Sequence, residues 1–361
     1  MSDSFRQAYD DLVEFIRKHP EIEIHECVTS IPENVRTEFY HRFNAVRKAF
    51  IEEKFSGWLR SAGLLQQNYA QAERSLSGLI SWEATPETSR VQRFLSNISD
   101  SMVRELFDSL FDLLKGKETS EGFEQTVIAR VSANWPDLFQ GGYEKWAVLS
   151  LVGLLEPDKI LRVDVRALKQ GERAKSAAYA PWDDVPPPQE AKSFFFSQPR
   201  NTVLSVPDLI VHSAKLNRFV GFRSEFRDGL YKGLNPSQTR EWLPLDTDML
   251  HLLESGLTLV YVAEEPEQIA MIADATRFCR PDLILLCLNT QSTERAKALE
   301  MLSRMDQRIA PRIGSLGILT EAWPEPVEPD SRIRFLEVGF DSSRLQEVIR
   351  TLAEATVPEI T

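Results

Sequence analysis

A proline-dense stretch near the middle of the chain separates two kinds of hydrophobic periodicity, and this change constrains the fold most strongly. Residues 180–200, APWDDVPPPQEAKSFFFSQPR, carry five prolines, and a helix cannot propagate through such a composition. Apolar residues recur with a helical period before this stretch and with a strand period after it. The sequence therefore predicts an all-helical domain over 1–155, a linker or wrapping arm over 156–200, and an α/β domain over 201–361.

Apolar residues at intervals of three and four mark the first half of the chain as helical. Thr29 or Ser30, which precede Pro32, are expected to cap the helix that contains Phe39 and Phe50. Because aromatic residues at helical spacing are typical of a helical core, the aromatic stripes of this half predict packing in preference to a ligand surface. Further helices are expected at about 66–80, 89–115, 122–133 and 143–155.

Strand-like segments alternate with helix-like ones in the second half. TVLSVPDLIVH, residues 202–212, and RFVGFRSEF, residues 218–226, are interpreted as neighbouring strands joined by a short turn. The later strand–helix–strand order predicts parallel pairing with helices on the sheet faces, and the second domain as a whole is expected to be a mixed sheet flanked by helices. No GxGxxG or GxxxxGK[ST] motif occurs, which disfavours the common nucleotide-binding folds. The later strand segments are LTLVYVAEE from 257, PDLILLCLN from 281, IGSLGILTE from 313 and RIRFLEV from 332.

The net charge limits how the protein could contact phosphates. A formal charge of −12 over 361 residues argues against a surface that coats nucleic acid or an anionic membrane. Residues 200–240 nevertheless hold seven basic and three acidic residues, a local basic patch in an acidic chain. The patch predicts a phosphate-facing groove that includes Lys215, Arg218, Arg223 and Arg240, and a solvated basic sheet edge is the alternative explanation.

Cysteine and histidine usage indicates a cytoplasmic protein without a structural metal site. Cys27, Cys279 and Cys287 lack metal-ligand or CxxC spacing and are predicted to be buried thiols in a reducing compartment. The first residues lack the apolar core of a signal peptide, and no apolar run approaches the roughly 18 residues of a membrane span. The histidines have no partner at metal spacing and are expected to be structural: His19, His25, His41, His212 and His251.

Two acidic residues lie where the first strand pair would bring them together. Asp208 belongs to the first strand segment and Glu225 to the second. If both face one side of the sheet, the carboxylates converge and hold either a proton or a cation, and oxygen ligands favour Mg²⁺. Such an ion would orient and deprotonate a water and offset charge on a phosphodiester. Strand alternation places Gly221, Arg223, Glu225 and Arg227 on one face, and Val220, Phe222 and Phe226 on the other.

These residues resemble the PD-(D/E)xK nuclease superfamily. Pro207 and Asp208 precede, by some seventeen residues, a Glu-x-cation element at the end of an apolar strand. The continuation EFRDGLYKGLNPSQTREWL, residues 225–243, is most similar to Holliday-junction-resolvase and VRR-type members, which have a glycine-containing turn, a SxxQ-type helix start and a Trp-Leu pair. The resemblance covers about residues 203–263.

The resemblance implies a restriction-endonuclease-like core in which Asp208 and Glu225 ligate Mg²⁺ and Gln238 lies nearby on a helix. Arg227 stands where the catalytic lysine belongs. Because arginine is locked in its charged form, it suits phosphate clamping better than water activation, and Lys232 is the candidate to replace the missing amine. The implied function is Mg²⁺-dependent hydrolysis of DNA in a DNA-processing or antiviral defence complex, with protein partners bound by the helical domain.

Two other functions remain open from the sequence. The domain could be a catalytically inactive nuclease-fold scaffold, which Arg227 and the acidic surface favour. It could also sense a small anion or nucleotide, because Asn289, Thr290 and Ser292 follow a strand and precede a helix, where α/β sheets and helix N-termini bind ligands. Capping of that helix would explain the same three residues.

Overall fold

The computed structural model describes residues 4–26, 28–80, 90–162, 188–191, 207, 209–224, 256–270, 280–323 and 332–355. Contacts between Cα atoms divide the chain into two units. The divisions fall within three helices, α3 (Ser56–Ser77), α4 (Arg90–Ser96) and α7 (Ser120–Leu154), whereas the sequence suggested boundaries near residues 155 and 200. Unit 1 comprises Met1–Gln66 and Gln92–Pro136, and unit 2 comprises Gln67–Val91 and Asp137–Thr361.

Unit 1 is helical, as the periodicity of the first half predicts. Helix α1 (Ser4–Lys18) packs along α2 (Glu33–Lys54). The expected cap of α2 is wrong, because Thr29 and Ser30 form strand β2, which pairs with β1 (Glu23–Ile24). Helix α2 instead begins after Pro32 without a side-chain cap. Three shorter helices follow in the described chain: α4 (Arg90–Ser96), α5 (Ile98–Arg104) and α6 (Phe107–Leu114).

Aromatic side chains form the core of unit 1, as predicted. The ring of Phe5 lies 5.0 Å from that of Phe50 and 5.6 Å from that of Phe123. The guanidinium of Arg47 lies 5.1 Å from the ring of Phe43 and 5.3 Å from that of Phe107, so its charge rests on aromatic faces. The aromatic stripes of this half therefore pack against one another.

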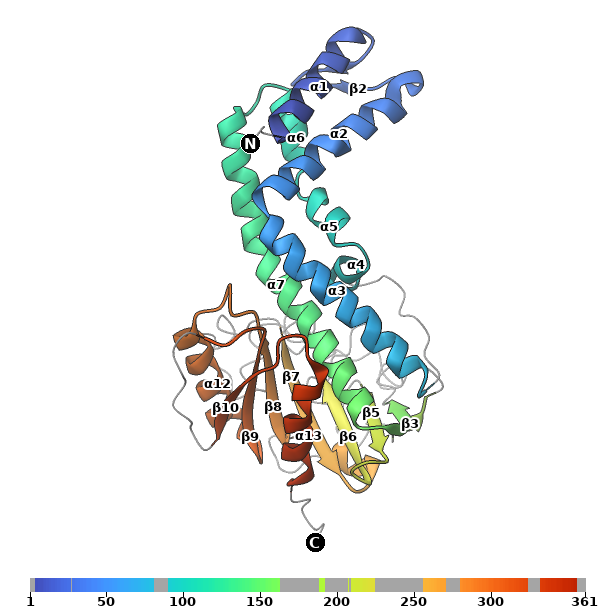
Figure 1. The fold of residues 1–361 in the computed structure, drawn as a ribbon, viewed down its shortest axis with the longest axis vertical. Helices are drawn as coiled ribbons and strands as arrows, with labels where there is room; N and C mark the ends of the chain where they lie inside the picture. Colours follow the sequence, from blue (N-terminus) through green and yellow to red (C-terminus); the bar gives the residue numbers. More distant parts are fainter. Residues whose placement is uncertain are drawn as a thin grey trace, which may run out of the picture. The chain divides into compact units, whose positions relative to one another are not determined.

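Helix α7 is one 35-residue helix where the sequence suggested two. Every residue from 141 to 150 is buried, although this run contains Glu144 and Lys145. The run belongs to unit 2, where the end of α7 lies against the sheet (Figure 1). Charged residues in a fully buried helical segment need compensating polar partners, and they mark this part of α7 as more than core packing.

The sheet of unit 2 is mixed, with strand order β10-β9-β8-β7-β6-β5-β3-β4. Strands β8, β9 and β10 run parallel, as predicted, and the remaining neighbours pair antiparallel. The strands are β3 (Pro157–Arg162), β4 (Gln189–Glu190), β5 (Leu209–Ser213), β6 (Arg218–Arg223), β7 (Leu257–Ala263), β8 (Leu283–Leu288), β9 (Gly314–Leu319) and β10 (Ile333–Glu337).

Parallel pairing was wrong for one of the predicted pairs, because β7 and β8 run antiparallel. Asp282, which precedes β8, accepts a 2.6 Å hydrogen bond from the backbone N–H of Val262 near the end of β7. Strand β8, which follows β7 and α11 (Pro266–Ala270) in the chain, thus begins at the end of the sheet where β7 ends. A strand that restarts at that end must run in the opposite direction.

Two described segments of the predicted linker or wrapping arm over residues 156–200 are strands of the sheet. Strand β3 pairs with β5, and β4 pairs with β3 at one edge of the sheet. Ile160 and Leu161 are buried there. The dense prolines begin only at Pro181, and Pro157 stands at the first position of β3, where a strand tolerates proline.

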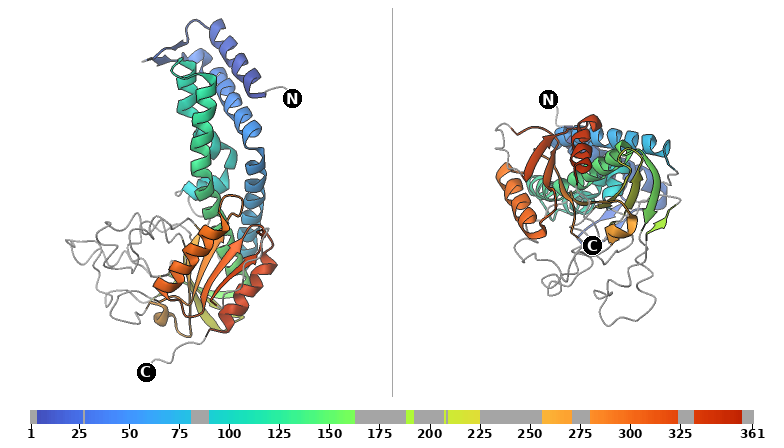
Figure 2. Two further views of the ribbon diagram at one scale, coloured as in Figure 1. Left: turned by 90° about the vertical axis from the view of Figure 1, so that its left-hand side faces the viewer. Right: turned by 90° about the horizontal axis from the view of Figure 1, so that it is seen from below.

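Helices cover both faces of the sheet in unit 2 (Figures 1 and 2). Helix α12 (Arg295–Ile309) lies on one face, where Met301 and Met305 join a core with Leu259 and Leu286. The end of α7 lies on the other face with α13 (Gln346–Ala353), which follows the short 3-10 helix η3 (Ser342–Leu345). The chain is therefore a mixed α and β protein, and the predicted burial of the Cys287 thiol is confirmed.

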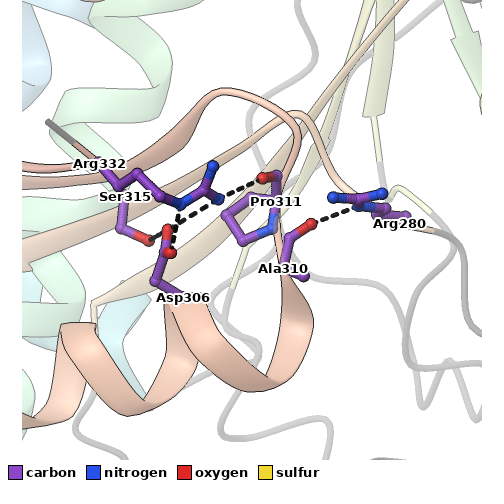
Figure 3. Close-up of polar contacts among 6 residues, drawn as sticks. All are labelled: Arg280, Asp306, Ala310, Pro311, Ser315 and Arg332. Carbon is purple, nitrogen blue, oxygen red and sulfur yellow. Dashed lines mark hydrogen bonds and ion pairs between the residues drawn. The ribbon is translucent and has the colours of Figure 1, made fainter.

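A network of polar contacts lies at the end of the sheet where β9 and β10 begin (Figure 3). Asp306, near the end of α12, accepts hydrogen bonds from Arg332 Nε at 2.7 Å and Ser315 Oγ at 3.1 Å. Arg332 also donates to the carbonyl of Pro311 at 2.7 Å. These contacts link the end of α12 to the starts of β9 and β10, and therefore stabilise the fold at this end of the sheet.

Candidate functional site

Strands β5 and β6 form the hairpin that the sequence predicts. Leu209 at the start of β5 pairs with Phe222 near the end of β6, so these two chain ends lie at the same end of the sheet. Asp208 directly precedes Leu209 in the chain, and Glu225 lies three residues after Phe222. Most of the predicted site lies outside the described residues: Asp208, Glu225, Arg227, Lys232, Gln238 and Arg240.

Pro207, the residue before Asp208, lies directly against β6. A Cβ at Gly221 would be 2.9 Å from Pro207 Cγ, shorter than real Cβ contacts, and 3.0 Å from Ile269 Cγ2, tighter than most of them. Glycine is therefore favoured at position 221, because the proline ring and α11 occupy most of the space of a side chain. The start of β5 is thereby fixed across β6, two residues from Arg223.

The predicted alternation of β6 is confirmed in its described part. Gly221 pairs with Ile210 and Tyr261, which both belong to the core under α12. Arg223 pairs with Leu259 of the same core. Since side chains alternate along a strand, Gly221 and Arg223 share one face, and Phe222 lies on the face of α7.

The described members of the predicted basic groove occupy two ends of the hairpin. Lys215 in the turn donates a 3.0 Å hydrogen bond to Gln346 Oε1. Arg218 donates at 2.8 Å to the carbonyl of Ala355, just beyond α13, where a cation also offsets the negative helix end. Arg223 lies at the other end of β6 and is only 4% exposed. These three side chains do not share one surface.

Helix α7 brings buried polar side chains to the same end of the sheet as Arg223. Thr258 at the start of β7 donates a 2.6 Å hydrogen bond to Glu144 Oε1, and both residues are buried. One turn earlier on α7, Gln140 packs against Gly256, whose added Cβ would lie 2.9 Å from Gln140 Cγ. Ser224 is buried directly after Arg223. The hairpin end is thus surrounded by polar groups held within the protein.

Sequence reasoning missed Gln140 and Glu144 because their segment has the pattern of a core helix. One signal was present: Glu144 and Lys145 interrupt the otherwise apolar run of GGYEKWAVLSLVGLL, residues 141–155. A charged pair in such a run predicts either exposure or a buried polar partner. The structure shows burial of both residues.

Two ionisable groups beside Glu144 are held in their neutral forms. Burial raises the pKa of the Cys287 thiol well above its ordinary value, and the nearby Glu144 carboxylate raises it further. Burial also raises the pKa of Tyr143 well above its ordinary value, with Cys287 as the second cause. The Tyr143 hydroxyl donates to the carbonyls of Gly339 at 2.7 Å and Leu319 at 3.1 Å. Neither group is an activated nucleophile, since reactivity needs the ionised form.

The polar residues after β8 stabilise their own loop. Asn289 Oδ1 accepts a hydrogen bond from the backbone N–H of Gln291, and its carbonyl accepts from Thr293. The N–H of Thr290 donates to Thr320 Oγ1. Helix α12 begins at Arg295 without a side-chain cap, so Asn289 forms an Asx-type turn and does not cap the helix. These contacts give no support to a ligand-sensing site.

Among the residues that the structure describes, no group of three or more His, Cys, Asp or Glu side chains could hold a metal ion. The predicted magnesium ligands Asp208 and Glu225 lie outside those residues. No described helix is both long and apolar enough to cross a membrane. No protein-family model, curated protein or solved structure matches the chain.

Proposed function

We propose that unit 2 is a PD-(D/E)xK-like domain that hydrolyses phosphodiester bonds in DNA with Mg²⁺. The observation that supports this proposal is the contact of Pro207 with Gly221. It places Pro207, which directly precedes Asp208, against Gly221 of β6, which lies four residues before Glu225. Two carboxylates carried by such neighbouring strand ends suit a hard divalent ion.

Each residue of the proposed site has a separate role. Asp208 and Glu225 would hold Mg²⁺, which supplies an activated water and offsets phosphate charge when bound. Arg227 would hold the phosphate through its planar pair of N–H donors. Lys232 would supply a second cation, and Gln238 would orient the water or the phosphate.

The position of the hairpin within the sheet also favours a precise site. Strand β5 pairs with β3 and β6, and β6 pairs with β5 and β7, so neither strand is at an edge. Sites carried by strands within a sheet are in general more precise than sites on loops. Unit 1 would supply the surface for protein partners of a DNA-processing or defence complex.

Cleavage of supercoiled plasmid and of branched DNA in Mg²⁺ or Mn²⁺ tests the proposal. We expect Asp208→Ala and Glu225→Ala each to lower the cleavage rate by about a hundredfold or more, because the ion loses a ligand. Asp158→Ala is the matched control. Asp158 is an exposed acid that contacts His212 at the far end of β5, so its loss should leave cleavage unchanged.

Binding of Mn²⁺ measured by calorimetry provides a second readout that does not depend on finding the right DNA. The wild-type protein should bind the ion, and the Asp208 and Glu225 variants should not. Absence of both metal binding and metal-dependent cleavage in the wild-type protein would refute hydrolysis.

A catalytically inactive scaffold is the second candidate. The contacts of Lys215 and Arg218 with the region of α13 favour it, because these cations serve the fold. A scaffold is expected to show no metal binding, and its unfolding midpoint should not change when Asp208 or Glu225 is replaced and Mg²⁺ is added.

A further inference from the structure

We draw no further inference here: the strongest candidate, the surface patch of unit 1 where the exposed ring of Phe107 lies beside the buried guanidinium of Arg47, belongs to the aromatic core already described, and nothing in the described part of the chain shows what would cover it.

Discussion

Thr258 and Glu144 show how a single contact can hold a carboxyl group inside unit 2. The threonine hydroxyl donates at 2.6 Å to a carboxyl oxygen, and both residues are buried. Loss of this hydrogen bond leaves a buried acceptor with one donor fewer, which is costly. The pair thus fixes α7 against the start of β7, at the end of the sheet proposed to bind metal.

Removal of this hydroxyl should be costly although the shape is conserved. We expect Thr258→Val to lower the free energy of unfolding by about 1.5–3 kcal/mol, since Glu144 loses a donor in a buried position. Urea denaturation followed by circular dichroism measures the change. Thr29→Val is the control, because Thr29 is exposed in β2 and its replacement should stay within about 0.5 kcal/mol. Equal effects of the two changes would contradict a role for the contact.

Asp282 gives a prediction about pH. Burial raises its pKa above the ordinary value, while Arg312, the N–H of Val262 and Arg280 act in the opposite direction. The folded state therefore keeps the proton to higher pH than the unfolded state. The contribution of this group to stability is full below the pKa of the unfolded state and falls as pH rises toward the folded value.

Asp282→Asn should remove this pH dependence while it keeps an oxygen for the N–H of Val262. We expect the unfolding free energy of the variant, relative to wild type, to increase from about pH 4 to pH 7. Urea denaturation across this range measures it. A relative stability that falls with rising pH would show that the ion pair with Arg312 outweighs burial.

At the scale of elements, the lack of a side chain at Gly221 lets the start of β5 pack closely against β6. Gly221 leaves room for Pro207 and for Ile269 of α11, so three segments meet on one face of β6. The sequence predicted the strands and their alternation from local periodicity. It did not predict why glycine is favoured at position 221, because the residues that fill the space come from other parts of the chain.

Gly221→Ala should therefore disturb the site as well as the fold. An added Cβ would lie 2.9 Å from Pro207 Cγ, and we expect a loss of about 1–3 kcal/mol in stability together with weaker Mn²⁺ binding. Gly317→Ala is the matched control, because its Cβ would meet the Phe335 ring on β10, away from the hairpin. This control should lower stability and leave Mn²⁺ affinity unchanged in the folded protein. Equal Mn²⁺ affinity in both variants would separate Pro207 from the site.

At the scale of the whole chain, the boundaries between the two units do not coincide with the ends of the helices. Helix α7 begins in unit 1 and ends in unit 2, and Pro136 lies within it at the division. Proline removes one helix hydrogen bond. Residues after it are almost all buried, whereas several before it are exposed. One continuous helix therefore contains two different environments.

Hydrogen exchange measured by mass spectrometry should detect this difference. We expect amides of residues 141–152 to exchange far more slowly than those of 120–132, because protection follows burial and local stability. The central strands β7 and β8 serve as the reference for strong protection. Uniform exchange along α7 would show that the two parts open together.

Local pattern by itself determined the types of most elements, the buried aromatic core of unit 1 and the two faces of β6, because helical and strand periods are properties of neighbouring residues. Tertiary structure decided the antiparallel direction of β8, the pairing of β3 with the sheet, the burial of Glu144 and Arg223, and the contact of Pro207 with Gly221. Each of these depends on contacts between residues distant in sequence. A periodic pattern shows which side chains share a face, but it carries no information about which distant segment covers that face.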